Sequence, residues 1–393
     1  VYKRQGSAVI NDGPKIIIDL EKDNNAIAFN NLMIKDNDSN ANMTFKYTPN
    51  LIELSFKGSL IEETLNRIFE QSLFPRGWVK GDFSASLRRD RYQQSEVRGQ
   101  LEGRDFILPL PLREPLKFKH AVITGRNRAI NIESAKLTWG ENNLEGKGSL
   151  GAAPDGIRLD INLKSDDIKV ENIIKLFSSR EESFQNNKKE SGLKKPALRG
   201  IIRISAPKVS WGRYSVAPAN ANIILASHSV YLVFKDTYLC DIAIPGRIVF
   251  SQDSIKFKFR PDARDKQLGS NLNCLLEKNL RITGKFDFNA NLNSQGNADA
   301  LRRELKGNVQ FQSKEGVIQR APVLAKIFAV LNVTELLRGK LPDFTTEGFK
   351  YNSINIKGDI DKGVLLIQEA VVDGTTCLLY TSPSPRDRTR SRM

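Results

Sequence analysis

Few residues of this 393-residue chain have the types and spacing of a catalytic or cofactor-binding site. Residues 146–151, GKGSLG, have the glycine spacing of a dinucleotide-binding loop. That loop must follow a strand and open a helix, whereas Pro154 and Asp155 follow here and predict a turn. Neighbouring carboxylates such as Glu62 and Glu63 are typical of solvated helix starts. Because the sequence also has no nucleophile elbow, Walker loop or HExxH motif, we predict that the chain is not an enzyme and holds no cofactor.

Cysteine and histidine residues offer the only other chemistry. Once the C-terminal segment is set aside for the reason given next, Cys240 and Cys274 remain, and His120 and His228 are the only histidines. This set lacks the Cys/His spacing of a zinc site, so no metal is predicted. The two cysteines form either a structural disulfide, in an oxidising compartment, or two buried thiols. The residues by themselves leave both alternatives open.

Both ends of the chain resemble translated sequencing-adaptor read-through, as found at the ends of metagenomic contigs. These ends are residues 1–5, VYKRQ, and residues 377–393, CLLYTSPSPRDRTRSRM. We exclude them from fold reasoning and expect the body to be a fragment of a longer protein, with any upstream signal peptide or membrane anchor missing. The ends hold six basic residues and one acidic residue, so their exclusion lowers the net charge from +15 to +10.

The remaining charges are spread singly along the predicted strands, which is typical of a solvated sheet face. No basic-aromatic cluster indicates a nucleic-acid site. No run of about 20 apolar residues predicts a membrane-spanning helix.

The longest regular pattern is the alternation of apolar and polar residues from 280 to 292. Period-two alternation predicts a β-strand with one apolar and one polar face, which at about 3.3 Å per residue would be about 40 Å long. Ile282, Phe286 and Phe288 share the apolar face with Gly284. Because few helices are predicted, this face must be covered by another sheet or by a bound lipid.

A five-residue motif, apolar–polar–Gly–any–apolar, recurs seven times. Its first, third and fifth residues share one face of an extended strand, so each glycine lies on the apolar side. A glycine inside a strand marks a bend or the close approach of another backbone. We interpret the motifs as a sheet that curls around its apolar face, with glycine leaving room in the concavity; the alternative is that each glycine ends a strand at a turn. The glycines are Gly58, Gly81, Gly99, Gly200, Gly284, Gly307 and Gly358.

These patterns predict a mainly β fold, an elongated curled antiparallel sheet with an apolar groove and a few short helices. Short helices are expected at 62–70 and 170–177. A longer helix at 322–338 is apolar almost all round in its first half, with Pro322 at its first position and Gly339 at its C-terminal cap.

A charged stretch divides the body into two regions. Residues 178–198 are charged and nearly free of large apolar side chains, which predicts a linker. The regions on either side are residues 6–177 and residues 199–376.

A series of short motifs follows Cys240. They are Cys240-Asp-Ile-Ala-Ile-Pro-Gly246, Leu272-Asn-Cys-Leu-Leu276, Ile282-Thr-Gly284, Leu305-Lys-Gly307, Gly316-Val-Ile318, LNVTELL at 331–337, Gly348-Phe-Lys-Tyr-Asn-Ser-Ile354 and Ile356-Lys-Gly-Asp-Ile360. Together they resemble the C-terminal region of AsmA-like envelope proteins, a group that includes the YhdP and TamB types. The resemblance covers about a third of the chain well, and residues 78–177 are similar more loosely. No motif is catalytic, so the match is specific for the family and not for a mechanism.

The resemblance implies a curled β-sheet groove in the periplasm of a Gram-negative bacterium, anchored to the inner membrane by the missing N-terminal segment. It implies a role in phospholipid movement between inner and outer membranes and in outer-membrane integrity. The implied partners are phospholipid acyl chains and outer-membrane components, with no nucleic acid. An oxidising periplasm favours a Cys240–Cys274 disulfide. The residues that we expect to line the groove are Leu280, Ile282, Phe286, Phe288, Leu292, Ile354 and Ile356.

The main alternative function is a scaffold or assembly factor for outer-membrane proteins. Its exposed strand edges would pair with client strands by β-augmentation. Lipid that co-purifies with the protein would favour transport, whereas a bound client would favour assembly.

Overall fold

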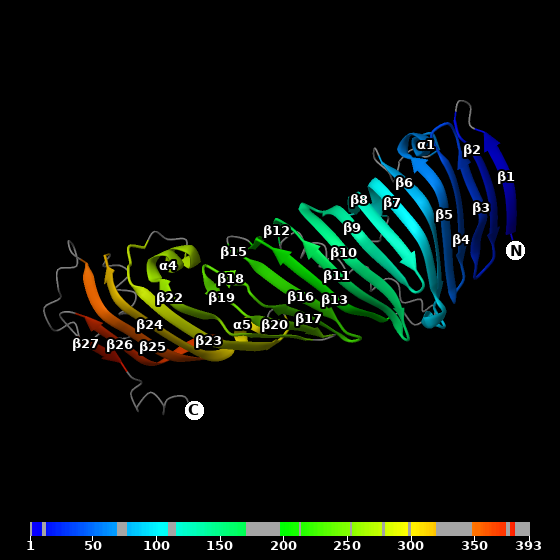
Figure 1. Cartoon of the computed structure of the whole chain (residues 1–393). Coiled ribbons are helices and arrows are strands. Elements are labelled where there is room, and N and C mark those ends of the chain that lie inside the picture. Colours follow the sequence, from blue (N-terminus) through cyan, green and yellow to red (C-terminus); the bar gives the residue numbers. More distant parts are fainter. Residues whose placement is uncertain are drawn as a thin grey trace. The chain divides into compact units, whose positions relative to one another are not determined.

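The computed structural model describes residues 2–9, 13–68, 77–108, 115–169, 197–211, 214–251, 254–276, 280–297, 300–319, 348–374 and 378–381. It is mostly β, with 73% in strands and 7% in helices, and its strands form a curled, unclosed mixed sheet with three short helices (Figure 1). The prediction of a mainly β, curled sheet is therefore confirmed. The chain divides into a first unit, Val1–Gly212 with Asn222–Ser227, and a second unit, Arg213–Ala221 with His228–Met393.

The first unit is built from long strands. They are β1 Tyr2–Val9, β2 Lys15–Lys22, β3 Ile27–Lys35, β4 Asn40–Tyr47, β5 Leu51–Ile61, β6 Trp78–Arg88, β7 Glu96–Leu108, β8 Leu116–Arg126, β9 Ala129–Trp139, β10 Asn142–Ala153, β11 Gly156–Lys164, β12 Asp167–Lys169, β13 Ala197–Ala206 and β14 Lys208–Trp211. Its described helical elements are α1 Glu62–Asn66, which lies within the predicted helix 62–70, and the 3₁₀ turn η1 Tyr92–Gln94. Strand β16, Ala219–Leu225, contributes residues to both units.

The strands from β1 to β11 pair antiparallel, each with the next along the chain. Strand β13 then pairs parallel with β11, and β14 pairs parallel with β12. The sheet is therefore mixed: the predicted antiparallel pairing holds from β1 to β11, and the pairs β11–β13 and β12–β14 depart from it. Parallel neighbours need a long connection, and the chain between β12 and β13 provides one. That connection, 170–196, holds the predicted helix 170–177 and most of the predicted linker, and it lies outside the described residues.

In the second unit the described strand registers are antiparallel. The elements are β15 Tyr214–Val216, β17 Ser229–Phe234, β18 Tyr238–Leu239, β19 Ile242–Ala243, β20 Gly246–Ser251, β21 Ile255–Phe259, β22 Asp262–Gln267, α4 Leu268–Leu276, β23 Lys285–Gly296, α5 Ala300–Arg303, β24 Lys306–Ile318, β25 Phe349–Asp361, β26 Val364–Gly374 and β27 Leu378–Thr381. The main order is β17–β20–β21–β23–β24–β25–β26–β27, and β22 also pairs with β23. The predicted helix at 322–338 lies outside the described residues.

The strand at the centre of the second unit differs from its predicted bounds. Strand β23 begins at Lys285, whereas the alternation predicts a start five residues earlier. The preceding residues still lie beside the end of β24, where the Thr283 N–H donates to the Val317 carbonyl (2.9 Å). Gly284, with φ +119°, interrupts the regular strand. A Cβ at Gly284 would collide with the Tyr351 hydroxyl, so this position is filled and does not leave the space that we expected.

Glycines of the recurring motif allow neighbouring backbones to approach one another. A Cβ at Gly58 would collide with the Asn40 carbonyl oxygen, and a Cβ at Gly99 would collide with the Asp82 carbonyl oxygen. Both glycines have positive φ, +122° and +98°, and both lie inside strands rather than at turns. They therefore mark close approaches within the sheet, as glycine in a strand interior commonly does, and do not open room on its apolar face.

Candidate functional site

One face of the first unit is apolar from strand to strand. From β2 to β11, the antiparallel registers pair an apolar residue or glycine on each strand with an apolar residue or glycine on the next strand. The central row is Ile18, Leu32, Met43, Phe56, Phe83, Gly99, Gly125, Ile130, Leu150 and Leu159. We call this surface the first apolar face.

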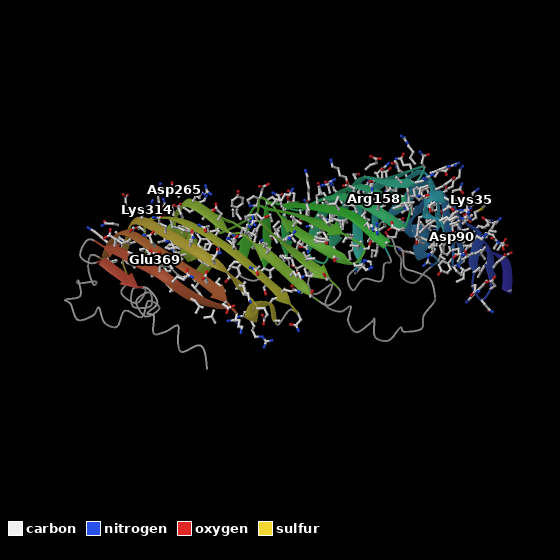
Figure 2. All side chains as sticks on the ribbon, turned by 90° about the horizontal axis from the view of Figure 1, so that it is seen from below. Lys35, Asp90, Arg158, Asp265, Lys314 and Glu369 are labelled. Carbon is white, nitrogen blue, oxygen red and sulfur yellow. A yellow bond between two sulfur atoms is a disulfide. The ribbon has the colours of Figure 1, made fainter. Side chains whose placement is uncertain are left out.

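The opposite face of the first unit carries charges in cross-strand pairs. Lys57 lies 3.1 Å from Asp82, and Lys136 lies 2.8 Å from Glu145, each pair being directly opposite in the register. Figure 2 shows charged side chains such as Arg158 projecting from the ribbon. Exposed pairs of this kind contribute little to stability. They identify this face of the sheet as the one that faces solvent.

Large apolar side chains remain exposed on the first apolar face. Phe45 and Tyr47 are each 37% exposed and Leu54 is 41% exposed, and Phe45 lies opposite Leu54. Helix α1 covers only one corner, where its Leu65 joins a small buried cluster that includes Leu60. The 3₁₀ turn η1, with Tyr92 buried, contacts β6 and β10. Among the described residues of the first unit, no further helix or sheet lies over the rest of the face, although Phe83 in its central row is only 5% exposed. A contiguous exposed apolar surface is a mark of an interaction site.

In the second unit, helix α4 covers one end of the corresponding apolar face. Leu268 of α4 is buried, and Leu272 and Leu275 pack against the same cluster. Three residues that we expected to line a groove are inside this core: Ile282 is 7% exposed, Phe286 5% and Ile354 6%. They belong to a closed core rather than to an open surface. We did not predict α4, although its leucines at 268, 272 and 275 have the spacing of one helix face.

A buried hydrogen-bond network fixes the covered end. The Tyr351 hydroxyl lies 2.8 Å from the Thr283 carbonyl oxygen and 2.8 Å from the Ser313 hydroxyl, and the Ser313 hydroxyl lies 3.0 Å from the Lys285 carbonyl oxygen. The two hydroxyl hydrogens serve these three contacts. Burial raises the pKa of Tyr351 above its ordinary value, and the hydrogen bond with Ser313 opposes that effect. This network ties the residues before β23 to β24 and β25.

A disulfide holds α4 in place. Cys240, in the turn between β18 and β19, is bonded to Cys274 of α4, and their Cα atoms are 5.8 Å apart. These are the two cysteines that the sequence offers as a pair. The bond links the helix to a hairpin whose Ile242 lies in the same core.

Beyond α4 the apolar face of the second unit continues, and in its described part the helix does not cover it. Phe288 and Ile356 lie at the edge of the covered core, half-buried, and Leu292 lies further along β23, also half-buried. Leu280 is half-buried and precedes β23. Helix α4 does not reach the row that contains Leu292, whereas the short helix α5 packs on the last residues of β23, where the Ser294 hydroxyl donates to the Leu301 carbonyl (2.7 Å). We call this row the open row; it consists of Phe234, Gly246, Phe259, Leu292, Gly307 and Ile360.

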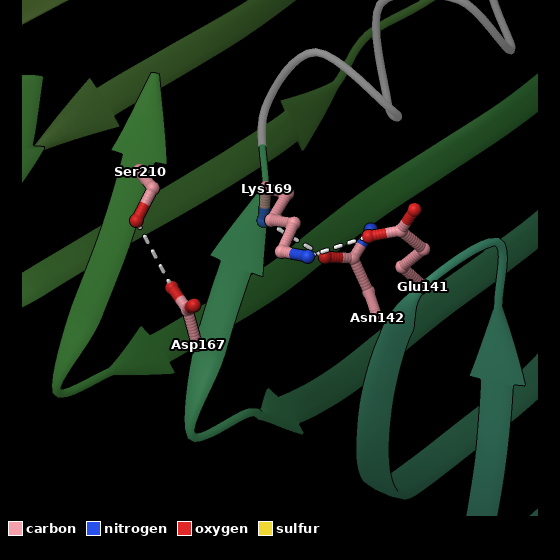
Figure 3. A network of polar contacts seen from close by, with 5 residues as sticks. All are labelled: Glu141, Asn142, Asp167, Lys169 and Ser210. Carbon is pink, nitrogen blue, oxygen red and sulfur yellow. Dashed lines mark hydrogen bonds and ion pairs between the residues drawn. The ribbon is translucent and has the colours of Figure 1, made fainter. Parts of the chain in front are cut away.

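A polar network in the first unit gives no sign of catalysis. The Lys169 backbone N–H donates to the Asn142 side-chain oxygen (2.8 Å), and the Lys169 ammonium pairs with Glu141 (Figure 3). Ser210 donates to Asp167 across two parallel strands. These contacts join strand ends, and among the described residues the exposed Asp167 carboxylate is the side chain that the Ser210 hydroxyl contacts. We therefore assign the network a structural role.

The described residues show neither a metal-binding cluster nor a membrane-spanning helix. No group of three or more histidine, cysteine or acidic side chains there is arranged to hold a metal ion. None of the described helices has the length and hydropathy needed to cross a membrane.

Comparison of the chain with protein-family models, with curated proteins and with solved structures found no match.

Proposed function

We propose that this chain binds phospholipid acyl chains on the apolar faces of its sheets and conducts phospholipid between the inner and outer membranes, which supports outer-membrane integrity. The observation that carries the proposal is the one-sided sheet: apolar rows run from strand to strand, and over most of them the described residues supply no second layer. The motifs from Cys240 onward, which resemble AsmA-like envelope proteins, support a periplasmic location and an inner-membrane anchor upstream.

The proposal needs burial alone and no catalytic group. Each CH₂ of an acyl chain that leaves water gains about 0.8 kcal/mol. A row of apolar residues that continues across strands would let chains move along it with little change in energy, while the headgroup stays in water. The curl of the sheet would make the apolar face the inside of a groove.

Mass spectrometry of lipids extracted from the purified protein tests the proposal first. We expect phospholipid to be recovered in stoichiometric amounts. If the extract holds no lipid, the proposal is wrong. Recovery of an unfolded outer-membrane protein in place of lipid would support the alternative of a scaffold that acts by strand pairing.

A matched pair of variants tests conduction. Leu292→Asp puts an unpaired charge on the open row, which is costly for passing acyl chains; Asn291→Asp adds the same charge to the opposite face at the neighbouring position. Transfer of a fluorescent phospholipid between vesicles should fall at least severalfold for Leu292→Asp and stay unchanged for Asn291→Asp. The urea midpoint reports whether both variants are folded. Equal transfer by the two folded variants would contradict the proposal.

A further inference from the structure

A row of arginines crosses the polar face of the first unit near the turns that join β8 to β9 and β10 to β11. The row consists of Arg126, Ala129, Gly151, Arg158 and Arg199, and each residue lies opposite the next in the strand registers. We call it the arginine row. Its residues alternate along the strands with those of the first apolar face, so they belong to the opposite face of the sheet. Neighbouring strands are about 4.8 Å apart, so the row is about 19 Å long.

The positive charge of this row is only partly neutralised. Arg199 lies 2.6 Å from Asp155. Arg126 and Arg158 are exposed, and among the described residues neither forms an ion pair. Arg128, in the turn between β8 and β9, is likewise exposed and unpaired within the described part of the chain. Figure 2 shows Arg158 projecting from the sheet.

Carboxylates on the strands of the row already have partners. Asp160 of β11 pairs with Arg203. Glu133 of β9 accepts a hydrogen bond from the Thr124 hydroxyl (2.7 Å). The connection 170–196, which leads into β13, holds six basic and four acidic residues, so its net charge adds to that of the row. The row therefore offers positive charge to an anionic partner.

The spacing of the arginines selects the kind of partner. Arg158 and Arg199 are on adjacent strands, whereas Arg126 is three strands, about 14 Å, away from Arg158. The residues between them, Ala129 and Gly151, are small, so a flat partner can lie across the row. A single phosphate ion needs donors that converge on it, whereas separated guanidinium groups suit several phosphates in one plane. The row contains no aromatic side chain on which a nucleic-acid base could stack.

We propose that the arginine row docks the first unit on a membrane surface that carries anionic phospholipids. A guanidinium group is always charged, and its donors match the geometry of phosphate oxygens. Each arginine close to an anionic leaflet adds to the attraction, which falls off within a Debye length. Docking goes beyond the proposed binding of acyl chains and does not rest on it, because docking needs only charge on the polar face.

Co-sedimentation of the full chain with vesicles at low ionic strength tests docking. One set of vesicles is phosphatidylcholine alone, and the other is an equimolar mixture of phosphatidylcholine and phosphatidylglycerol. The wild type should bind the mixed vesicles more tightly, and the excess over phosphatidylcholine alone measures the electrostatic contribution. In the double variant Arg126→Gln/Arg158→Gln, the dissociation constant for the mixed vesicles should rise about tenfold or more. Both side chains are exposed, so the urea midpoint of unfolding should stay unchanged.

Two control variants separate the position of the charges from their number. Arg260→Gln/Arg281→Gln removes two arginines of the second unit that are also exposed and, among the described residues, unpaired, and its affinity for the mixed vesicles should equal that of the wild type. Arg126→Lys/Arg158→Lys keeps the charge of the row and should also bind like the wild type. Equal affinity of the wild type and Arg126→Gln/Arg158→Gln, or an equal loss in the second-unit control, would overturn the proposal.

Competitors distinguish a membrane surface from other anionic partners. Inorganic phosphate should displace the protein from mixed vesicles no more than sodium chloride of the same ionic strength, because both act by screening. Stronger displacement by phosphate would indicate a site for single ions, and tighter binding of a short duplex DNA than of mixed vesicles would indicate a nucleic-acid surface. Either result would overturn the proposal. Leu292→Asp, which should lower lipid transfer, should dock like the wild type, so failure of the proposed function and failure of docking are distinguishable.

Discussion

Phe286 and Phe259 lie on the same face of the second unit, but their surroundings differ. Phe286 is 5% exposed beneath α4, with Leu268 and Ile282 in the same core. Phe259 is half-buried in the open row, opposite Leu292. The same alternation of apolar and polar residues thus produces a closed protein core beneath α4 and, as far as the described residues show, a half-buried surface further along the strand. The helix that follows β22 decides between the two outcomes, and the strand pattern does not.

The largest expected effect is a difference in stability between alanine substitutions at these two phenylalanines. Phe286→Ala leaves a cavity in a closed core, so we expect the free energy of unfolding to fall by about 3–5 kcal/mol. Phe259→Ala removes a side chain that already contacts water, and its cost should be less than half as large. Urea unfolding of both variants measures the difference. Equal losses would mean that the open row is covered in the folded protein.

The next largest effect on stability concerns the disulfide that holds helix α4 on the core. The Cys240–Cys274 disulfide joins residues that are 34 positions apart in the sequence. Its reduction should lower the free energy of unfolding by about 2–4 kcal/mol. The measurement is the urea midpoint with and without dithiothreitol. A double serine variant at the two cysteines is the control, since its midpoint should not respond to the reductant. Complete alkylation of the unreduced, denatured protein would show that the bond does not form.

The smallest effect should come from the polar face. The hydrogen bond with His120, and then the one with Lys80, lowers the pKa of Glu102 below its ordinary value of 4.5. The carboxylate therefore contributes stability above pH 4.5, and this contribution is lost as the pH falls through the lowered pKa. Glu102→Gln should show a shallower loss of stability below pH 4.5 in urea unfolding, with unchanged lipid binding. A steeper loss in Glu102→Gln would contradict the direction of the shift.

Particular residues show how far the sequence predicts this structure. The alternation along β23 correctly assigns Phe286, Phe288 and Leu292 to one face, because side-chain direction in a strand is a local property. It gives these three residues the same environment, whereas the structure buries the first beneath α4 and leaves the last half-buried. Burial depends on which distant segment packs on the face, and that is a property of the folded chain.

Pairing direction was likewise outside the reach of the sequence. The parallel pairing of β11 with β13 depends on a long connection whose path no local pattern specifies. The turn between β18 and β19 meets helix α4 through the disulfide, and only the two cysteines, Cys240 and Cys274, indicated that these distant segments could meet.

The central claim is tested most directly by a photo-crosslinking amino acid placed in turn at Leu292, Phe286 and Asn291, with phospholipid present. Our account predicts efficient capture of phospholipid from Leu292, on the open row, and little capture from Phe286, beneath α4, or from Asn291, on the polar face. Equal capture from the three positions, or no capture from Leu292 in a folded protein, would show that the open row does not hold acyl chains.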